Sequence, residues 1–374
     1  MATDPAKIMA GLREYLGDGH DADDSVPYWL PTCLTNINIA VGGPEAKGFP
    51  GGRLITISGP ESSGKTAMAT QLMVQAQQQG GFASMGDHEH AFEMRHALRQ
   101  GLDAERFRYS RPLTAEEGFE DLYKIMHRLR AAELGVTLPE PKKGSAAALA
   151  KLRDAIRSKG GEVVPLVQLI DSLASLIPEA ADIDYRDQNM KTKNMELPAF
   201  LSQELKRVSR DAGITKSTVV MLNQLRTNPG IMFGDNTTEP GGQAIKFYAS
   251  LQIRLRRVDK LYQTWGDKAT PVIGDIVEMY VRKNKVARPF VKTRYVFRTA
   301  DPVGLDDVLT YVYLGKEAEI LGPKTGVSID SSKFLGGGAG KKRHNIAEFE
   351  KLARGDEEVR QALEDYVLKN TGVI

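Results

Sequence analysis

Apolar positions in this chain fall into short continuous runs that alternate with helix-forming stretches. Continuous apolar runs of this length suit strands that are buried on both faces of a sheet. A helix-forming stretch at 67–79 follows the first run, and another at 146–159 precedes the third. The alternation predicts an α/β fold with a mainly parallel, twisted sheet. The four runs lie at residues 53–58, 80–90, 164–172 and 217–224.

Two regions fall outside this alternation. Residues 5–16 have the pattern of an amphipathic helix, and the residues alone leave open whether it packs on its own domain or on a neighbouring subunit. An insert near 131–162 contains a turn at 138–145 and a basic helix. Such a helix either contacts nucleic acid or forms a solvated surface elaboration. We expect the core to begin near Trp29.

Composition narrows the classes of protein that fit. The chain has 374 residues, 41% hydrophobic and 26% charged, which suits one large core with smaller appendages. No apolar run is long enough to cross a membrane, residues 1–7 lack the apolar core of a signal peptide, and the single Cys33 excludes an intramolecular disulfide. We therefore expect a cytoplasmic protein. With a net charge of +2, nucleic-acid binding has to come from local basic clusters.

Residues 59–66 fit the phosphate-loop pattern of glycine, four residues, and glycine-lysine-threonine. An ordinary glycine-rich turn is the alternative, but the strand-like run before the loop and the helix-forming stretch after it favour a nucleotide site. Backbone amides would hold phosphates, Lys65 would reach the β- and γ-phosphates, and the Thr66 hydroxyl would bind Mg²⁺. The expected ATP contacts are Gly59, Pro60, Glu61, Ser62, Ser63, Gly64, Lys65, Thr66 and Ala67.

Two of the apolar runs carry an acidic residue close to their ends, Glu89 and Asp171. Because parallel strands present their carboxyl ends at one edge of a sheet, both would face Lys65. Glu89 would then orient or deprotonate the attacking water, and Asp171 would hold the Mg²⁺ hydration shell. The alternatives are a helix cap at Asp171 and a metal site that includes His88 and His90, which strand alternation places opposite Glu89.

A long polar loop follows the fourth run, from Arg226 to Gly242. It is too long for an ordinary connection and begins beside the expected nucleotide crevice, which indicates a function. Arg226 offers a phosphate contact, and the apolar Ile231, Met232 and Phe233 are side chains able to wedge between bases. A lid without a ligand is the alternative.

The C-terminal part contains a glycine-rich basic turn at 336–344, and helix-forming stretches begin at Asn345. Such a turn either captures duplex DNA through its phosphates or is solvated surface.

Seven motifs occur in the order that is found in bacterial RecA recombinases. From about Trp29 to about Ile329 the sequence resembles that family, which implies a RecA-like P-loop ATPase core with an N-terminal helix and a small C-terminal α/β domain. The domains expected on this basis are 1–28, 29–310 and 311–374. The motifs lie at residues 59–66, 87–91, 169–172, 223–226, 230–234, 241–250 and 283–285.

The resemblance implies roles for residues that match the family's motifs. Glu89 is similar to the catalytic carboxylate, and Gln224 to the residue that senses the γ-phosphate and reports to the long loop. Lys283 and Lys285 are similar to lysines that reach the ATP of the adjacent subunit. A subunit interface is implied for Lys246, Phe247 and the N-terminal helix, which would dock on the neighbouring subunit. Residues 182–196 and the long loop resemble two DNA-binding loops, with the contacts Arg186, Lys191, Lys193, Arg226, Pro229, Gly230, Ile231, Met232, Phe233, Gly241 and Gly242.

Several positions depart from the family's pattern. Glu93 and His96 stand where an aspartate and a tyrosine usually flank adenine, so the base contact is expected to differ. Pro229 replaces an aliphatic residue of the second DNA loop, and Gln252 replaces an interface arginine. These differences indicate a divergent member.

The resemblance implies a DNA-dependent ATPase that uses ATP and Mg²⁺. The protein would form a helical homo-oligomeric filament on single-stranded DNA and exchange strands with homologous double-stranded DNA. A single-strand-binding protein or a mediator would be further partners, and no membrane is involved. The alternatives are a non-recombining, DNA-binding regulatory paralogue and a ring-forming, helicase-like motor.

Overall fold

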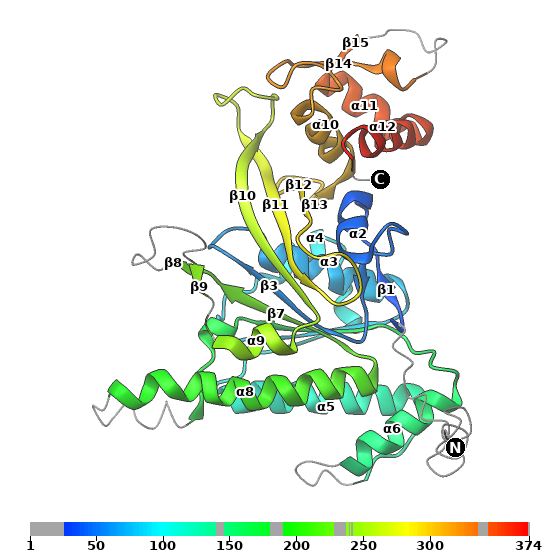
Figure 1. The fold of residues 1–374 in the computed structure, drawn as a ribbon. Coiled ribbons are helices and arrows are strands. Elements are labelled where there is room, and N and C mark those ends of the chain that lie inside the picture. The colour runs from blue at the N-terminus through cyan, green and yellow to red at the C-terminus, as the bar shows by residue number, and fades with distance from the viewer. Residues whose placement is uncertain are drawn as a thin grey trace, which may run out of the picture.

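The computed structural model describes residues 26–139, 146–179, 190–227, 237–238, 240, 242–335 and 343–372. Within them, a nine-stranded sheet runs through the molecule in the order β13-β12-β11-β10-β3-β7-β6-β4-β5 (Figure 1). Its strands are β3 (Leu54–Gly59), β4 (Phe82–Asp87), β5 (Phe107–Ser110), β6 (Leu166–Asp171), β7 (Thr218–Gln224), β10 (Leu251–Tyr262), β11 (Val272–Asn284), β12 (Lys292–Arg298) and β13 (Gly304–Asp306).

The sheet is parallel where the apolar runs predicted it. From β10 through β3, β7, β6 and β4 to β5 every pairing is parallel, and β11, β12 and β13 continue the sheet with antiparallel pairings. All residues of β3 and β6 are buried, because these strands carry helices on both faces. The predicted α/β class with a mainly parallel sheet is confirmed.

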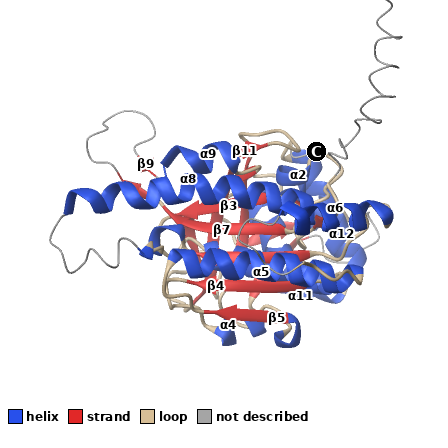
Figure 2. Ribbon diagram, turned by 90° about the horizontal axis from the view of Figure 1, so that it is seen from below, coloured by secondary structure: helices blue, strands red, loops and turns tan. Residues whose placement is uncertain are grey.

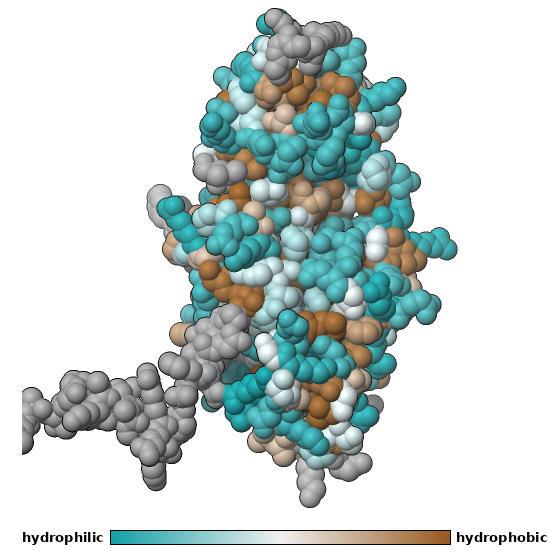
Figure 3. All heavy atoms as spheres, turned by 90° about the vertical axis from the view of Figure 1, so that its right-hand side faces the viewer, coloured by the Kyte–Doolittle hydropathy of each residue, from teal (hydrophilic) through white to brown (hydrophobic). Residues whose placement is uncertain are grey.

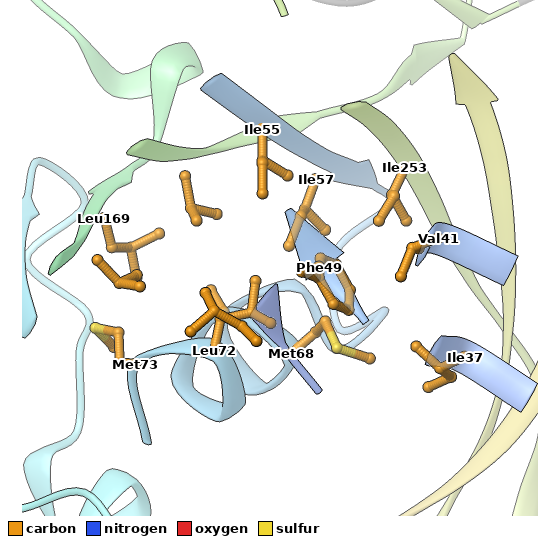
Figure 4. Close-up of a cluster of buried hydrophobic side chains, with 14 of the residues drawn as sticks. Ile37, Val41, Phe49, Ile55, Ile57, Met68, Leu72, Met73, Leu169 and Ile253 are labelled. Atoms are coloured by element: carbon orange, nitrogen blue, oxygen red, sulfur yellow. The ribbon is translucent and has the colours of Figure 1, made fainter. Parts of the chain in front are cut away.

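Helices cover both faces of the parallel part (Figures 1 and 2). Ile55 and Ile57 of β3 point toward Met68 and Leu72 on one side, in the cluster that Figure 4 shows. On the other side Leu54 packs in a second cluster. The first layer contains α2 (Thr35–Gly42), α3 (Lys65–Gln78) and α4 (Met94–Arg99), and the second contains α5 (Ala115–Leu134), α8 (Met190–Thr215) and α9 (Gly242–Tyr248).

The expected insert contains α6 (Ala146–Ser158), whose apolar side packs on the end of α5 through Leu152 and Ile156. This helix was predicted from the sequence. Close to this contact, the fully buried guanidinium of Arg130 donates to the carbonyl oxygens of Thr215 at 2.8 Å and Val164 at 3.1 Å. Thr215 is the last residue of α8, and Val164 begins the third apolar run. Arg130 therefore links these two segments to α5 through hydrogen bonds.

The C-terminal elements gather at the far ends of β10, β11 and β12, where they share a core with Leu261, Ile276 and Val296. Asn345 caps α11 with a reciprocal capping box that includes Glu348, which explains the helix start expected there. These elements are α10 (Asp307–Glu317), β14 (Ser328–Asp330), β15 (Arg343–Asn345), α11 (Ile346–Gly355) and α12 (Glu357–Asn370).

The surface carries both hydrophilic and hydrophobic side chains. Figure 3 shows a face on which hydrophilic side chains predominate and hydrophobic ones are scattered. No helix in the described part of the chain is long and apolar enough to span a membrane. The helix expected at 5–16 lies outside the described residues. The short elements are β1 (Trp29–Leu30), β2 (Phe49–Pro50), β8 (Arg226–Thr227), β9 (Thr237–Thr238) and the 3₁₀ turns Ala104–Arg106, Leu173–Ser175 and Ser331–Lys333.

Candidate nucleotide site

The phosphate loop connects the end of β3 to the start of α3. Gly59 is tightly enclosed, since a Cβ there would collide with the Ser63 hydroxyl and the carbonyl oxygen of Leu255. Gly64 has a φ of +86°, a left-handed conformation that glycine adopts without strain. The loop therefore turns sharply into the helix, and the free amides at the N-terminus of α3 are available to an anion.

Lys65 lies across this loop. Its ammonium donates to the carbonyl oxygens of Pro60 at 2.8 Å and Gly59 at 3.1 Å. Burial lowers the pKa of Lys65, and the nearby Asp171 and Glu89 carboxylates act in the opposite direction. A cation held beside free amides and close to two carboxylates is the arrangement that a phosphate with a bound divalent metal requires.

Thr66 and Asp171 supply the oxygens of the expected metal site. The Thr66 hydroxyl donates to Oδ2 of Asp171 at 3.0 Å, although the two residues are 105 positions apart. Burial, followed by the charge of Glu89, raises the pKa of Asp171 to about 7. Hydroxyl and carboxylate oxygens are hard ligands that suit Mg²⁺, which takes few protein ligands and keeps waters or substrate phosphates. Asp171 does not cap a helix, since a short 3₁₀ turn that begins after Ser172 follows it.

Glu89 lies just beyond the end of β4 and accepts several hydrogen bonds. Its Oε1 accepts from Nε2 of Gln224 at 3.1 Å, from the hydroxyl of Ser175 at 3.3 Å and from the hydroxyl of Ser172. The sheet order creates this contact, because β6 lies between β4 and β7 and all three end at the same edge. The two serine contacts were missed from the sequence, where only the small residues after Asp171 hinted at them.

His88 points away from this cluster. Its ring is buried against Gly118 of α5, where a Cβ would collide with it. Burial lowers the pKa of His88 to about 4, so the imidazole is neutral at pH 7. No group of three or more His, Cys, Asp or Glu side chains suited to a metal occurs among the described residues.

The expected adenine contacts and interface residues lie on the surface. Glu93 precedes α4 and His96 lies within it, and both side chains are exposed. Lys283 donates to the carbonyl oxygens of Lys246 at 2.6 Å and Phe247 at 3.1 Å. The Phe247 side chain is 70% exposed, and Lys246 and Lys285 are exposed as well. The structure thus brings the expected interface residues Lys246, Phe247 and Lys283 together.

The ends of the long polar loop are held close to the nucleotide site. The Leu225 amide donates to the carbonyl oxygen of Gly59 at 3.3 Å, and the Asn223 side chain donates to the carbonyl oxygen of Pro240 at 2.9 Å. Arg226 and Thr227 pair with Thr238 and Thr237 as a two-stranded ribbon, β8 with β9. An irregular loop was expected over this whole stretch. The structure differs at the base of the loop, where the backbones of β8 and β9 pair and form the ribbon.

Other residues expected to bind DNA are described only in part. The backbones of Lys191 and Lys193 lie in the first turn of α8, so the loop expected at 182–196 is helical from Met190. The run of Met, Lys, Glu and Leu residues there favours a helix. Gly242 is the first residue of α9. Arg186, Pro229, Gly230, Ile231, Met232, Phe233 and Gly241 lie outside the described residues.

Comparison with known proteins identifies the family to which this chain belongs. The family model described as the RecA N-terminal domain matches residues 16–137 and 130–298. The chain belongs to the RecA family. Protein RecA of Chloroflexus aurantiacus (strain ATCC 29364 / DSM 637 / Y-400-fl) is 31% identical over 351 residues, which cover 92% of this chain and 84% of that protein.

Two further RecA relatives give similar values. Protein RecA of Chloroflexus aggregans is 32% identical over 325 residues, which cover 86% of this chain and 77% of that protein. Protein RecA of Enterococcus faecalis is 32% identical over 273 residues, which cover 73% of this chain. The match spans 65% of the Enterococcus faecalis protein, slightly less than two thirds of its length. Membership of the family was predicted from the motifs and is confirmed.

Proposed function

We propose that this chain is a DNA-dependent ATPase that forms a helical filament on single-stranded DNA and exchanges strands with a homologous duplex. The hydrogen bond between Gln224 and Glu89 carries the proposal. It joins the carboxylate beside the phosphate loop to the strand end from which the long loop begins. A change at the γ-phosphate would therefore reach the loop through a single side chain.

Each group of residues at the site has a separate task in the hydrolysis of ATP. Amides of the phosphate loop and Lys65 bind the phosphates, and Glu89 accepts a proton from water as the water oxygen attacks the γ-phosphorus. The bond from that phosphorus to the bridging oxygen breaks, which yields ADP and phosphate. Thr66 and Asp171 would hold Mg²⁺, which when bound neutralises charge on the phosphate oxygens.

We expect a second subunit to complete the site. Lys283 and Lys285 lie on the surface that exposes Phe247, and among the described residues the Lys283 ammonium donates to the backbone carbonyls of Lys246 and Phe247. Positive side chains that meet the ATP of a neighbour would make assembly depend on nucleotide. Head-to-tail contacts of this kind do not close and so extend as a filament.

The test is ATP hydrolysis with and without single-stranded DNA, followed by strand exchange between labelled oligonucleotides. The proposal requires DNA to stimulate hydrolysis and requires exchanged product when ATP is present. Normal ATP binding without stimulation would rule out the ATPase assignment. Stimulated hydrolysis on coated DNA without exchange would instead support the regulatory paralogue, and closed rings in electron micrographs would support the motor.

A further inference from the structure

A hydrogen-bond network beside Glu89 has no part in the steps above. Asp87, the last residue of β4, is 1% exposed and its carboxylate accepts three hydrogen bonds. Oδ1 accepts from the Glu89 amide at 3.1 Å, and Oδ2 accepts from the Phe92 amide at 3.0 Å and from the Tyr109 hydroxyl at 2.8 Å. The carboxylate therefore spans the turn that presents Glu89.

Tyr109 reaches Asp87 from the neighbouring edge strand. The register of β4 with β5 places Tyr109 opposite Met85, two residues before Asp87 and so on the same face of the sheet. The Tyr109 ring stacks on Phe92, with centroids 5.7 Å apart. The ring thus supports the turn by packing, and the hydroxyl supports it through Asp87.

Arg111 extends the chain of hydrogen bonds to the surface. Its Nε donates to the Tyr109 hydroxyl at 2.7 Å, and its guanidinium carbon lies 5.4 Å from the centre of the Tyr109 ring. The hydroxyl accepts from a cation and donates to an anion, so each bond polarises the next. The negative charge buried at Asp87 is stabilised in this way by a guanidinium that solvent can reach.

We propose that Tyr109 and Arg111 are positioning residues that hold Glu89 in place through Asp87. The inference rests on the proposed ATPase function and concerns the same site. Two acceptors fix the Glu89 amide, namely the Asp87 carboxylate and the carbonyl oxygen of Asp171 at 3.3 Å. If the Tyr109 hydroxyl is lost, Oδ2 of Asp87 keeps the bond from the Phe92 amide but loses its bond from the hydroxyl. The carboxylate is then held less firmly, and the restraint that it places on the Glu89 amide weakens.

The first experiment compares Tyr109→Phe with Tyr313→Phe. Both changes remove a hydroxyl that accepts a hydrogen bond from an arginine. The donor to Tyr109 is Arg111, and the donor to Tyr313, in the C-terminal elements, is Nη1 of Arg294 at 3.3 Å. We expect Tyr109→Phe to lower kcat for ATP roughly 5- to 20-fold with KM changed less than about twofold, because the effect is on the orientation of the base. Tyr313→Phe should leave both constants unchanged. An unchanged kcat in Tyr109→Phe, or an equal loss in both variants, would overturn the inference.

The second experiment uses Arg111→Ala and Arg111→Lys. We expect the alanine variant to lose kcat to a similar extent and the lysine variant to recover most of it, since lysine keeps a charged donor for the Tyr109 hydroxyl. Equal loss in the two variants would contradict a role through that hydrogen bond.

Hydrogen exchange of the nucleotide-free chain separates this inference from the ATPase proposal. In Tyr109→Phe the amides of the turn from His88 to Phe92 should exchange severalfold faster, with the exchange of α3 unchanged. Exchange at the parental rate would reject the positioning role. Faster exchange in a protein whose parent hydrolyses no ATP would support the positioning role and reject only the ATPase assignment.

Discussion

At the scale of single residues, Glu89 is the centre of the hydrogen bonds beside the phosphate loop. Its Oε1 accepts from Gln224, Ser172 and Ser175. Glu89→Gln keeps the size of the side chain and removes its ability to accept a proton. We expect hydrolysis to fall 10²- to 10⁴-fold, the range typical of a lost general base, while ATP affinity changes only severalfold. Steady-state hydrolysis and equilibrium binding of ATP are the measurements.

The control for Glu89→Gln is Glu162→Gln, because Glu162 is exposed and lies just before the third apolar run. That variant should hydrolyse ATP as the parent does. Parental hydrolysis in Glu89→Gln would show that another group takes the proton.

The contact between His88 and Gly118 gives a prediction about stability. Gly118→Ala would drive a methyl group into the buried His88 ring, and we expect a loss of roughly 1–3 kcal/mol in the free energy of unfolding. Gly213→Ala is a matched control, because Gly213 also lies within a helix and a Cβ there meets no atom within 4 Å. That change should be neutral or stabilising by up to about 1 kcal/mol. Urea unfolding measures both, and equal effects would contradict the steric argument.

The sequence predicted which residues would gather at the phosphate loop, because each of them belongs to a motif or follows a strand end. Lys65, Thr66, Glu89 and Asp171 belong to this group, and the structure brings them to one edge of the sheet. Tyr109 could not be predicted in this way, because its contact with Asp87 depends on β5 being the neighbour of β4. Neighbour order in a sheet is a property of the whole chain and not of local spacing.

At the scale of elements, α12 meets the start of α2 through a partly buried polar contact that includes Tyr311 of α10. The Tyr311 hydroxyl accepts from the Thr35 amide at 2.9 Å, and Glu364 of α12 hydrogen-bonds the side chains of both residues. Burial raises the pKa of Glu364, so this carboxyl is more stable in its neutral form inside the folded protein than in the unfolded chain.

Glu364→Gln tests this contact by fixing a neutral side chain at the position. Because the pKa of Glu364 is raised in the folded protein, this residue stabilises the folded parent fully below about pH 4.5, the ordinary glutamic acid value. That stabilisation is lost as pH rises through the folded pKa. We therefore expect Glu364→Gln to unfold at an equal or higher temperature than the parent at pH 7 and to show a smaller decrease in stability as pH rises above 4.5. Thermal melts at several pH values decide this, and a lower melting temperature at pH 7 would contradict it.

Element prediction succeeded for the buried parallel strands and was weaker elsewhere. Strands β10, β11 and β12 carry exposed and half-buried residues between buried ones, so they lack the continuous apolar runs that identified β3 and β6. The ribbon of β8 and β9 has only two residues on each side, too few for any periodic pattern.

At the scale of the whole molecule, Lys283 tests the proposal that a second subunit completes the nucleotide site. We expect Lys283→Ala to bind ATP as the parent does and to lose at least about tenfold of the hydrolysis measured with single-stranded DNA, because the missing charge acts on a neighbour's nucleotide. Lys292→Ala is the control, since its ammonium lies over the Tyr280 ring in the same part of the sheet. Filament length in electron micrographs and DNA-stimulated hydrolysis are measured together, and parental turnover in Lys283→Ala would reject the role across the interface.

The position of β3 in the sheet also has a consequence for protein synthesis. Its two neighbours come late in the chain: Gly52, just before β3, bonds Thr218 of β7 across 166 residues, and Ser58 bonds Ile253 of β10 across 195 residues. A ribosome therefore completes the phosphate loop long before the strands that will flank it exist. Until β10 has emerged, the β3 segment of the nascent chain exposes unpaired backbone and apolar side chains, which favour aggregation. An mRNA that ends before the codon for Leu251 should therefore yield an insoluble polypeptide. It should not yield a partly active nucleotide-binding fragment.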